Sequence, residues 1–566
     1  MKTPHQVKLE LAKSLEKLLS EPNITFEIND KIELGDFSCS IAMKIASAKK
    51  SNPRQVAAEI IEKLTLPLEI SKVEIAGPGF LNFFFSENYL LSLFVLPLIE
   101  PLAAKQHLVI DYSHPNIAKP LGIHHVLSTV IGQAIANLNR AVGHQVTAWN
   151  YLGDWGTQFG KLIYAYKTWG DQSVIEKDPI NELLKLYVKF HQLAETSPEL
   201  EDFGREEFRK LEAGDSQNRQ LWTWIVELSK SDFSKVYAKL GGISFDLFSG
   251  EADREAELPA IIKDGMSQGI FEVGEEGAII ANLEAESLPP FLVQKKDGAT
   301  LYSTRDIASV KVRAVDHDGD KLIYVVDSSQ SLHFQQLFAT VKKFDWMPPN
   351  TELLHVKFGR MNFKDSKMST RKGNIIHLEA LIDEAIERAA KIVEEKNPTL
   401  ENKEEVARII GIGSLKYSFL SQAPETDILF DWDKILSFEG NSAPYLQYSY
   451  ARANSILKQI DQDSIPENFN LEDLASVQTD ELAVLKKLVQ FSEIVATSAT
   501  KSKPNLLANY LFELAKLFNS FYVNFPVLSC PETDLKNFRV ALVIRFLHTM
   551  KTGLNLLAGI EVPDKM

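Results

Sequence analysis

Cysteine, net positive charge and long apolar runs are all scarce in this sequence. Cys39 and Cys530 are the only cysteines among 566 residues, and no Cys-x-x-Cys pair occurs, so we expect no structural zinc site. Two isolated thiols fit a reducing compartment, and we expect two small buried side chains in a cytoplasmic protein. Because no stretch of about 20 apolar residues occurs, we predict no membrane-spanning helix.

Positive charge is limited, since 61 lysines and arginines face 76 aspartates and glutamates and the net charge is −15. This balance argues against a general nucleic-acid binder. Confined basic surfaces remain possible, because charges are screened beyond about 8–10 Å in physiological salt. Residues 355–374 predict one such surface, with six cations against a single acid: Lys357, Arg360, Lys364, Lys367, Arg371, Lys372 and Asp365.

The length is sufficient for several domains, and the pattern predicts an α/β multidomain protein. Periodicity in the N-terminal part predicts helices at 7–19 and 53–64 and strands at 72–75 and 80–85. From about 376 onward only helical periodicity is found. The predicted units are an α+β domain at 1–100, a Rossmann-like region at 101–375 with a helical insertion at about 165–290, a helical connector at 376–440 and an all-α domain at 441–566.

The α/β region shows the order strand, loop, helix, strand that builds a doubly wound nucleotide-binding unit. The apolar run Leu108-Val109-Ile110 precedes a loop and a helical stretch at about 125–141, and a strand-like segment at 146–149 leads into Gly153-Asp154-Trp155-Gly156. The pattern resumes at 322–326. Ligands bind beyond the carboxyl ends of such strands, so we expect the loops there to form a site.

Two segments carry residues suited to a nucleoside triphosphate. In 114–129, a helix N-terminus offers free N–H groups to phosphate, and His124 and His125 can donate hydrogen bonds to its oxygens. In Lys367-Met368-Ser369-Thr370-Arg371-Lys372-Gly373-Asn374, cations on a short polar loop can clamp the phosphates and stabilise leaving pyrophosphate. Exposed cap histidines and a solvated basic loop are the alternative interpretations. Together, the two segments favour ATP-dependent activation of a substrate.

These two segments resemble the paired signature sequences of class I aminoacyl-tRNA synthetases, and their surroundings narrow the resemblance to the arginyl-tRNA synthetases. The resemblance covers essentially the whole chain, and it includes further segments at 75–80, 153–160, 302–306, 437–441 and 443–448. It implies a class I catalytic domain, an N-terminal domain that contacts the outer corner of tRNA, and a C-terminal helical anticodon-binding domain.

Both signatures depart from the family pattern. The usual His-x-Gly-His reads Gly122-Ile123-His124-His125 here, so either His124 supplies the missing imidazole or the ATP pose shifts. The second signature has Thr370 where a lysine is usual. By resemblance Lys119, just before the first signature, substitutes for that lysine.

The resemblance also implies an arginine site. Tyr302 and Asp306 are four residues apart and so share one face of a helix. With Glu251 they would hold the guanidinium, because carboxylates complement its planar fork of N–H donors. The rest of the amino acid is assigned to His114, Asn116 and Gln330.

The implied reaction has two steps. The arginine carboxylate attacks the α-phosphate of ATP, which Mg²⁺ accompanies, and a ribose hydroxyl at the tRNA 3′ end then attacks the adenylate. Catalysis is assigned to His124, His125, Lys119, Lys367, Ser369 and Arg371. ATP binding is assigned to Gly122, Gly153, Asp154, Gly156, His333, Gly359, Met361, Lys367, Met368 and Ser369. No protein residue is assigned to a metal.

The implied partner is tRNA(Arg), bound by a monomer and required before arginine is activated. In the C-terminal domain the candidate contacts are Tyr448, Arg452, Lys501 and Tyr510, since loop bases are commonly read by stacking and hydrogen bonding. The alternative is that aromatics at helical spacing are core residues.

Two other functions remain open at this point. One is another class I synthetase, with the cysteinyl enzymes as the nearest, although their zinc cysteines are absent. The other is a tRNA-binding paralogue without activity, which the altered 122–125 sequence favours and the retained arginine-site residues oppose.

Overall fold

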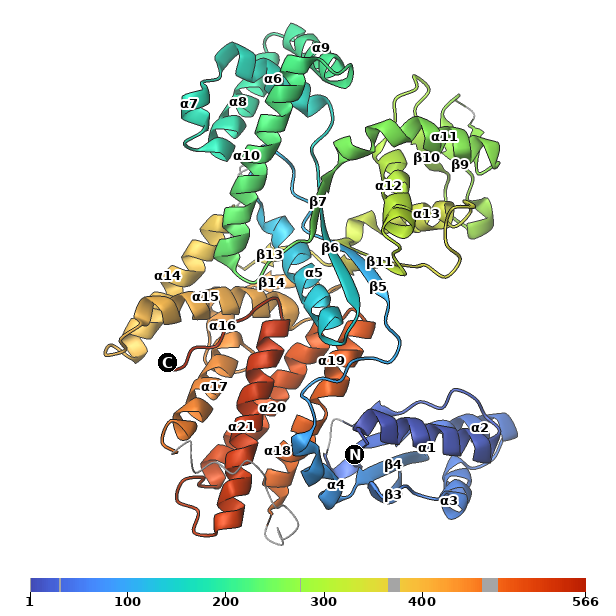
Figure 1. Ribbon diagram of the computed structural model, residues 1–566, viewed down its shortest axis with the longest axis vertical. Coiled ribbons are helices and arrows are strands. Elements are labelled where there is room, and N and C mark those ends of the chain that lie inside the picture. Colours follow the sequence, from blue (N-terminus) through green and yellow to red (C-terminus); the bar gives the residue numbers. More distant parts are fainter. Residues whose placement is uncertain (1, 30–31, 275, 365–376, 461–476) are drawn as a thin grey trace.

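The computed structural model describes residues 2–29, 32–274, 276–364, 377–460 and 477–566 (Figure 1). Its N-terminal part is an antiparallel sheet of order β1-β2-β4-β3 packed on helices. The elements are α1 (Pro4–Leu19), β1 (Glu27–Ile28), β2 (Phe37–Cys39), α2 (Ile41–Lys49), α3 (Pro53–Lys63), β3 (Ile70–Ala76), β4 (Phe80–Phe85) and α4 (Glu87–Ser92). The predicted first helix begins earlier than periodicity indicated, because Thr3 caps it by accepting from the Gln6 N–H at 3.2 Å.

The centre of the molecule is a five-stranded sheet of order β12-β11-β5-β6-β7, parallel at every pairing. Its strands are β5 (His107–Asp111), β6 (Gln145–Leu152), β7 (Leu247–Gly250), β11 (Lys321–Asp327) and β12 (Glu352–Phe358). Successive residues enter different cores, with Leu108 and Ile110 on the side of α5 (Ile123–Ala141) and Val109 on the opposite side. Both faces are therefore covered, as expected for a doubly wound sheet.

The segment predicted as a helical insertion has three parts. It contains α6 (Thr157–Trp169), α7 (Gln172–Ile175), α8 (Pro179–Ala194), α9 (Glu199–Glu212) and α10 (Ser216–Leu240), then β7, and then α11 (Leu258–Ser267) beside an antiparallel sheet of β8 (Phe271–Val273), β9 (Ile279–Ala281) and β10 (Phe291–Gln294). The expectation of a mostly helical insertion missed β7, which belongs to the central sheet. Four residues are too few to show a strand period.

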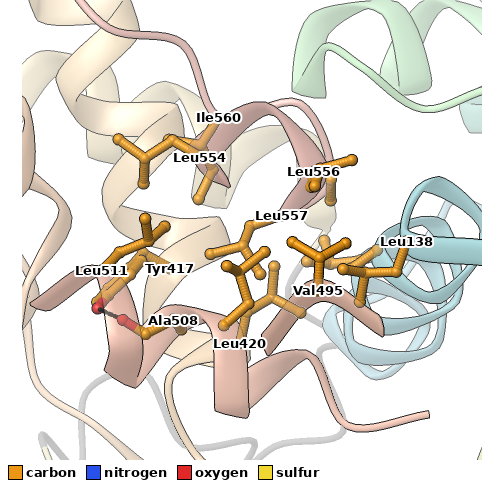
Figure 2. Packing of buried hydrophobic residues seen from close by; sticks show 14 of the residues in the cluster. Leu138, Tyr417, Leu420, Val495, Ala508, Leu511, Leu554, Leu556, Leu557 and Ile560 are labelled. Atoms are coloured by element: carbon orange, nitrogen blue, oxygen red, sulfur yellow. Dashed lines mark hydrogen bonds between the residues drawn. The ribbon is translucent and has the colours of Figure 1, made fainter. Parts of the chain in front are cut away.

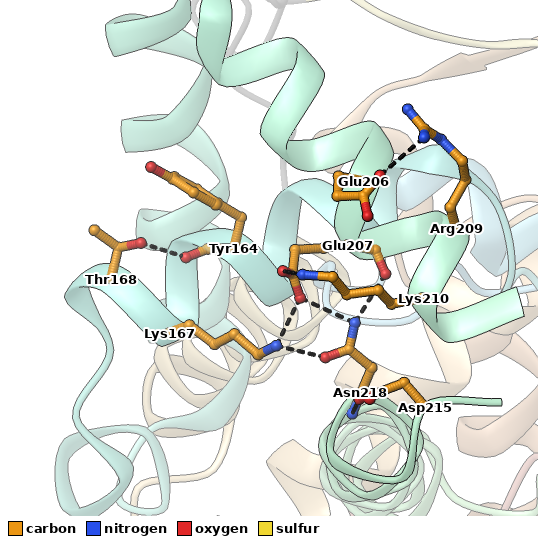
Figure 3. A network of polar contacts seen from close by, with 9 residues as sticks. All are labelled: Tyr164, Lys167, Thr168, Glu206, Glu207, Arg209, Lys210, Asp215 and Asn218. Atoms are coloured by element: carbon orange, nitrogen blue, oxygen red, sulfur yellow. Dashed lines mark hydrogen bonds and ion pairs between the residues drawn. The ribbon is translucent and has the colours of Figure 1, made fainter. Parts of the chain in front are cut away.

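A polar network joins three of these helices (Figure 3). Lys167 Nζ of α6 donates to Glu207 Oε2 of α9 and to Asn218 Oδ1 of α10, each at 2.6 Å. Asn218 is fully buried and donates in turn to the Glu207 backbone oxygen at 2.8 Å. Because every partner is satisfied, the network fixes the start of α10 relative to α6 and α9.

The chain from the second half of the sheet onward is mainly helical. Its elements are α12 (Tyr302–Lys311), α13 (Ser331–Val341), β13 (Met361–Phe363), α14 (Leu378–Lys396), α15 (Lys403–Leu420), β14 (Ile428–Phe430), α16 (Trp432–Ile435), α17 (Ala443–Leu457), α18 (Thr479–Val489), α19 (Phe491–Thr500), α20 (Pro504–Asn524) and α21 (Thr533–Leu556). The prediction that only helices follow residue 376 was wrong at β14, which pairs with β13 in parallel.

The C-terminal helices pack directly on α5, and the two share one hydrophobic core. Figure 2 shows Leu138 near the end of α5 beside Val495 of α19, with Leu557 next to them. All three residues are fully buried. Helix α5 therefore connects the hydrophobic core of the parallel sheet with that of the C-terminal helices.

No helix among the described residues is both long and apolar enough to cross a membrane. The two cysteines, Cys39 and Cys530, are both buried and unpaired, as expected from their isolation in the sequence.

Candidate active site

The predicted site residues follow the carboxyl ends of the parallel strands, which all meet at one edge of the sheet. The loop with His114 and Asn116 follows β5, and Gly153 follows β6. Glu251 follows β7, Gln330 follows β11 and Gly359 follows β12. This is the edge at which open α/β sheets bind ligands.

The loop after β5 is held in an unfavourable backbone conformation. Ser113, His114 and Ala118 have positive φ angles of 84°, 53° and 59°. Such conformations cost about 1–3 kcal/mol each for non-glycine residues and persist only where neighbours fix them. The Ser113 N–H donates to Ser128 Oγ at 2.9 Å, and the Ala118 N–H donates to Ser229 Oγ at 3.0 Å. The loop is thus preorganised around Asn116, whose side chain is exposed.

The N-terminus of α5 presents a neutral histidine. Gly122 caps the helix, and its N–H donates to His125 Nδ1 at 3.0 Å. Burial, with smaller contributions from His124 and His114, lowers the pKa of His125 to about 3. Because Nδ1 accepts a hydrogen bond, the neutral ring carries its proton on Nε2. That N–H and the helix N-terminus can both donate to a phosphate.

His124 lies beside His125 but is exposed, and the two ring centroids are 3.9 Å apart. Lys119 extends from the same loop toward the helical insertion, where its Nζ lies 5.4 Å from the centre of the Tyr187 ring. Burial lowers the pKa of His124, so Lys119 is the cation of this pair.

The second signature, 367–374, and its predicted site residues Lys367, Met368, Ser369, Thr370 and Arg371 lie outside the described residues. The residues that follow it are described. His377 forms an antiparallel bridge with Gly122, and the Leu378 N–H donates to the Leu121 oxygen at 2.8 Å. The first described residues after the second signature, His377 and Leu378, therefore pack against the start of α5.

The glycine-rich segment packs against the loop after β5. Gly153 forms a parallel bridge with Asn116, and a Cβ at Gly153 would lie 2.4 Å from Asn116 Oδ1, so a side chain is excluded there. Gly156 begins α6 with a φ of 117°, which favours glycine. Gly359 is buried, and a Cβ there would lie 2.5 Å from the backbone of Thr426. Met361 is half-buried.

Asp154, which the sequence assigns to ATP, is held by contacts within the protein. Its side chain is buried, with Oδ1 accepting from the Ala252 N–H at 3.0 Å, and its backbone oxygen accepts from Trp222 Nε1 at 2.8 Å. Burial raises the pKa of this carboxyl to about 7. The side chain therefore supports the β7–Glu251 connection, and an ATP contact at this position would have to come from the backbone.

The predicted arginine-site acids lie near one another. Asp306 is one turn after Tyr302 on α12, as the spacing predicted, and Asp306 Oδ2 lies 2.6 Å from His333 Nε2. The pKa of Glu251 is raised to about 8, mainly by burial, with Asp154 and Asp306 adding to the rise and Arg305 opposing it. A buried acid with other acids beside it is suited to a cationic ligand. His333, assigned to ATP from the sequence, contacts the predicted arginine-site acid Asp306, and its assignment to ATP stays a prediction.

A cluster of buried polar side chains lies near Asp306, and each of them has an atom without a hydrogen-bond partner. They belong to Asp111, His114, Tyr151, Ser309, Arg313 and Tyr324. Arg313 Nη2 lies 2.7 Å from Asp111 Oδ2, and its guanidinium carbon lies 5.1–5.4 Å from the rings of Trp149, Tyr151 and Tyr324. Sequence reasoning missed this cluster. The signal was there, since Ser309 and Arg313 follow Asp306 at helical spacing.

Comparison with known proteins agrees with this geometry over the whole chain. Family models described as "Arginyl tRNA synthetase N terminal domain", "tRNA synthetases class I (R), catalytic domain" and "DALR anticodon binding domain" match residues 5–85, 97–432 and 446–566. The arginine–tRNA ligase of Fusobacterium nucleatum is 41% identical over 97% of this chain and 96% of its own length. The chain belongs to the arginyl-tRNA synthetase family.

Other members of this family show the same extent of similarity. The arginine–tRNA ligase of Clostridium perfringens is 40% identical over 99% of this chain and 98% of its own length. The solved arginyl-tRNA synthetase of Thermus thermophilus has the same fold, with a TM-score of 0.86 at 24% identity over 99% of this chain and 100% of its own.

Among the tRNA contacts predicted for this family member, Tyr510 requires correction. Its side chain is 3% exposed, and its hydroxyl donates to the Lys487 oxygen at 2.6 Å. No face of the ring is free to stack on a base, so Tyr510 is a core residue, as aromatics at helical spacing often are. Tyr448 and Lys501 are exposed, and the Arg452 guanidinium carbon lies 3.8 Å from the centre of the Tyr522 ring.

Proposed function

We propose that this arginyl-tRNA synthetase joins L-arginine to tRNA(Arg) with ATP, releasing AMP and pyrophosphate. Relatives of the same length that are named arginine–tRNA ligase support the overall reaction. The structural observation that carries the proposal is that a helix N-terminus with a neutral histidine lies at the same sheet edge as the Glu251–Asp306 site.

The first step forms arginyl-adenylate. Glu251, Asp306 and Tyr302 hold the guanidinium, and the exposed amides of Asn116 and Gln330 bind the α-amino group. The arginine carboxylate then attacks the α-phosphate and pyrophosphate leaves. His125 Nε2–H and the α5 N-terminus donate to the charge that develops on the phosphate, which lowers the barrier without a protein nucleophile.

Mg²⁺ enters this reaction with ATP. Among the described residues, no group of three or more His, Cys, Asp or Glu side chains is placed to hold an ion. In the proposed role, Lys119 and the cations of 367–372 neutralise the phosphates, and His124 donates a hydrogen bond to them.

In the second step a ribose hydroxyl at the tRNA 3′ end attacks the adenylate carbonyl and AMP leaves. The N-terminal domain binds the tRNA together with three residues of the helical domain, the exposed Tyr448 and Lys501 and the half-buried Arg452. We propose a monomeric cytoplasmic enzyme. Because the chain is acidic, tRNA affinity rests on confined patches and falls as salt rises.

Aminoacylation of tRNA with arginine, using lysine and cysteine as control amino acids, tests the proposal. Arginine-dependent transfer with neither control active is expected. Absence of arginine-dependent pyrophosphate exchange in the presence of tRNA would instead favour the inactive tRNA-binding paralogue. Transfer of cysteine would favour the other class I reaction.

A further inference from the structure

One face of α10 holds both loops of the candidate active site. Trp222 Nε1 donates to the Asp154 oxygen at 2.8 Å, and Ser229 Oγ accepts from the Ala118 N–H at 3.0 Å. Tyr237 shares a 2.7 Å hydrogen bond with Ser113 Oγ. The three α10 residues are spaced by seven and eight, which is two helical turns each, so they lie on the same face.

These contacts meet the strained part of the site. Ser113 and Ala118 are two of the three positive-φ residues of the loop that carries Asn116. The Tyr237 hydroxyl also accepts from Asn150 Nδ2 at 3.1 Å, so it joins the ends of β5 and β6. A shift of α10 along its axis would therefore release the backbone on which the substrate contacts depend.

The two ends of α10 are both fixed. Its first turn is held by the Lys167–Glu207–Asn218 network (Figure 3). Its last turn is held by Lys416 of α15, whose ammonium is completely buried. Lys416 Nζ donates to the oxygens of Gly241 at 2.7 Å, Ala558 at 2.8 Å and Gly559 at 3.3 Å.

The partners of Lys416 are carbonyls at the C-terminal ends of two helices. Gly241 caps α10, and Ala558 and Gly559 follow α21. Carbonyls there carry partial negative charge, which an ammonium neutralises. The backbones also touch directly, because a Cβ on Gly242 would lie 2.8 Å from Gly559 Cα. Lys416 therefore links the C-terminal end of α10 to the segment that follows α21.

We infer that Lys416 is a positioning residue for the reaction, acting through α10 on the loop at 113–118. It touches neither substrate nor the reacting atoms, and its effect passes through Tyr237 and Ser229 to the backbone beside Asn116. This inference rests on the proposed function for its kinetic readout but not for its structural one.

The test compares Lys416→Met with Lys239→Met as a matched control. Lys239 is two residues before Gly241 on α10, but its ammonium makes exposed ion pairs with Glu379 and Asp383 of α14. We expect Lys416→Met to lower kcat/KM for arginine by about 10-fold to 100-fold, the scale of a small misplacement of reacting groups, and Lys239→Met to leave it unchanged.

Hydrogen exchange of the peptide that contains Ala118 provides a readout independent of activity. We expect faster exchange in Lys416→Met at a temperature where both variants remain folded, because the Ala118 N–H loses its fixed Ser229 acceptor. Should Lys416→Met not fold, Gly242→Ala loosens the same junction with a single methyl group. Unchanged exchange at 113–118 in a folded variant with a lowered melting temperature would overturn the inference, leaving Lys416 as a stabilising residue only.

A double-mutant cycle with Tyr237→Phe completes the test. If Lys416 acts through α10, the losses of kcat/KM in the two single variants are not additive in the double variant, whereas independent effects add. Additivity would contradict the inference. A wild-type enzyme inactive with arginine would defeat the proposed function, while the exchange result would still decide the role of Lys416.

Discussion

The backbone N–H of Gly122 and the ring of His125 are joined by a 3.0 Å hydrogen bond to Nδ1. This contact fixes which nitrogen carries the proton, and burial keeps the ring neutral by lowering the pKa of His125 to about 3. The only ring donor available to a substrate is therefore Nε2–H, at the N-terminus of α5.

His125→Ala removes this donor. We expect kcat/KM for ATP to fall at least about 100-fold, the scale of one transition-state donor. Because the His125 ring is already neutral well below pH 6, its titration should not lower kcat near pH 6.5. The pH profile of kcat should therefore have the same shape in the wild type and in this variant. Steady-state arginylation between pH 5.5 and 8 measures both effects, and a loss of less than threefold would remove His125 from catalysis.

Asp306→Ala removes the acid that lies 2.6 Å from His333. A guanidinium would lose a charged partner in a partly buried site, so we expect kcat/KM for arginine to fall about 100-fold or more while the KM for ATP stays near the wild-type value. Glu272→Ala, an exposed acid on β8, serves as the control. Equal effects on the two substrates would indicate a general distortion rather than a lost contact.

Arginine binding should release a proton from Glu251. Its pKa is raised to about 8 by burial first, so at pH 7 the free enzyme holds this carboxyl protonated. A bound guanidinium favours the ionised form, so affinity should rise by up to about tenfold per pH unit toward pH 8 and level off above it. Calorimetry in buffers of different ionisation enthalpy measures the released proton. In Glu251→Gln the binding enthalpy should be the same in all buffers. A wild-type binding enthalpy that does not depend on the buffer would contradict proton release from Glu251.

His124→Gly restores the residue usual in the family at this position. If His124 supplies the missing imidazole, kcat should fall by roughly 100-fold, because a transition-state donor is lost. If instead its exposed ring only narrows the approach of ATP, the KM for ATP should fall and kcat should hold. Separate measurement of kcat and KM distinguishes the two, and unchanged values for both would refute the substitute-imidazole hypothesis.

Tyr510→Phe should affect stability and not tRNA. Its buried hydroxyl donates to the Lys487 oxygen, so we expect a loss of about 1 kcal/mol in the free energy of unfolding, with the KM for tRNA unchanged. Arg452→Ala should do the opposite, raising the KM for tRNA with little effect on stability. Urea unfolding and arginylation kinetics check the pair, and a raised KM in Tyr510→Phe would restore Tyr510 as a contact.

The elements that sequence predicted well are those with a strong local signal. The helix with Tyr302 and Asp306, the strand pair at 70–85 and the loops after β5 and β6 each carry a period or a turn residue. β7 was missed because four residues carry no period, and its place in the sheet depends on pairing with β6 across nearly a hundred residues.

The sequence indicated which residue types follow the strands, but it did not indicate which of their side chains are buried. Nothing in the sequence shows that the Asp154 side chain packs against Gly250 or that Tyr510 is buried in the core. His333 was assigned to ATP by the family resemblance, and its position beside Asp306 depends on the packing of α13 against α12. Such orientations are decided by tertiary contacts between distant segments.

The three carbonyl partners of Lys416 also bear on when the enzyme becomes complete during its own synthesis. They lie 175, 142 and 143 residues from it along the chain. Contacts of such large sequence separation form late. A ribosome must therefore release the chain beyond Gly559 before the loop that carries Asn116 acquires its final support, so a product that ends before Ala558 would lack this support.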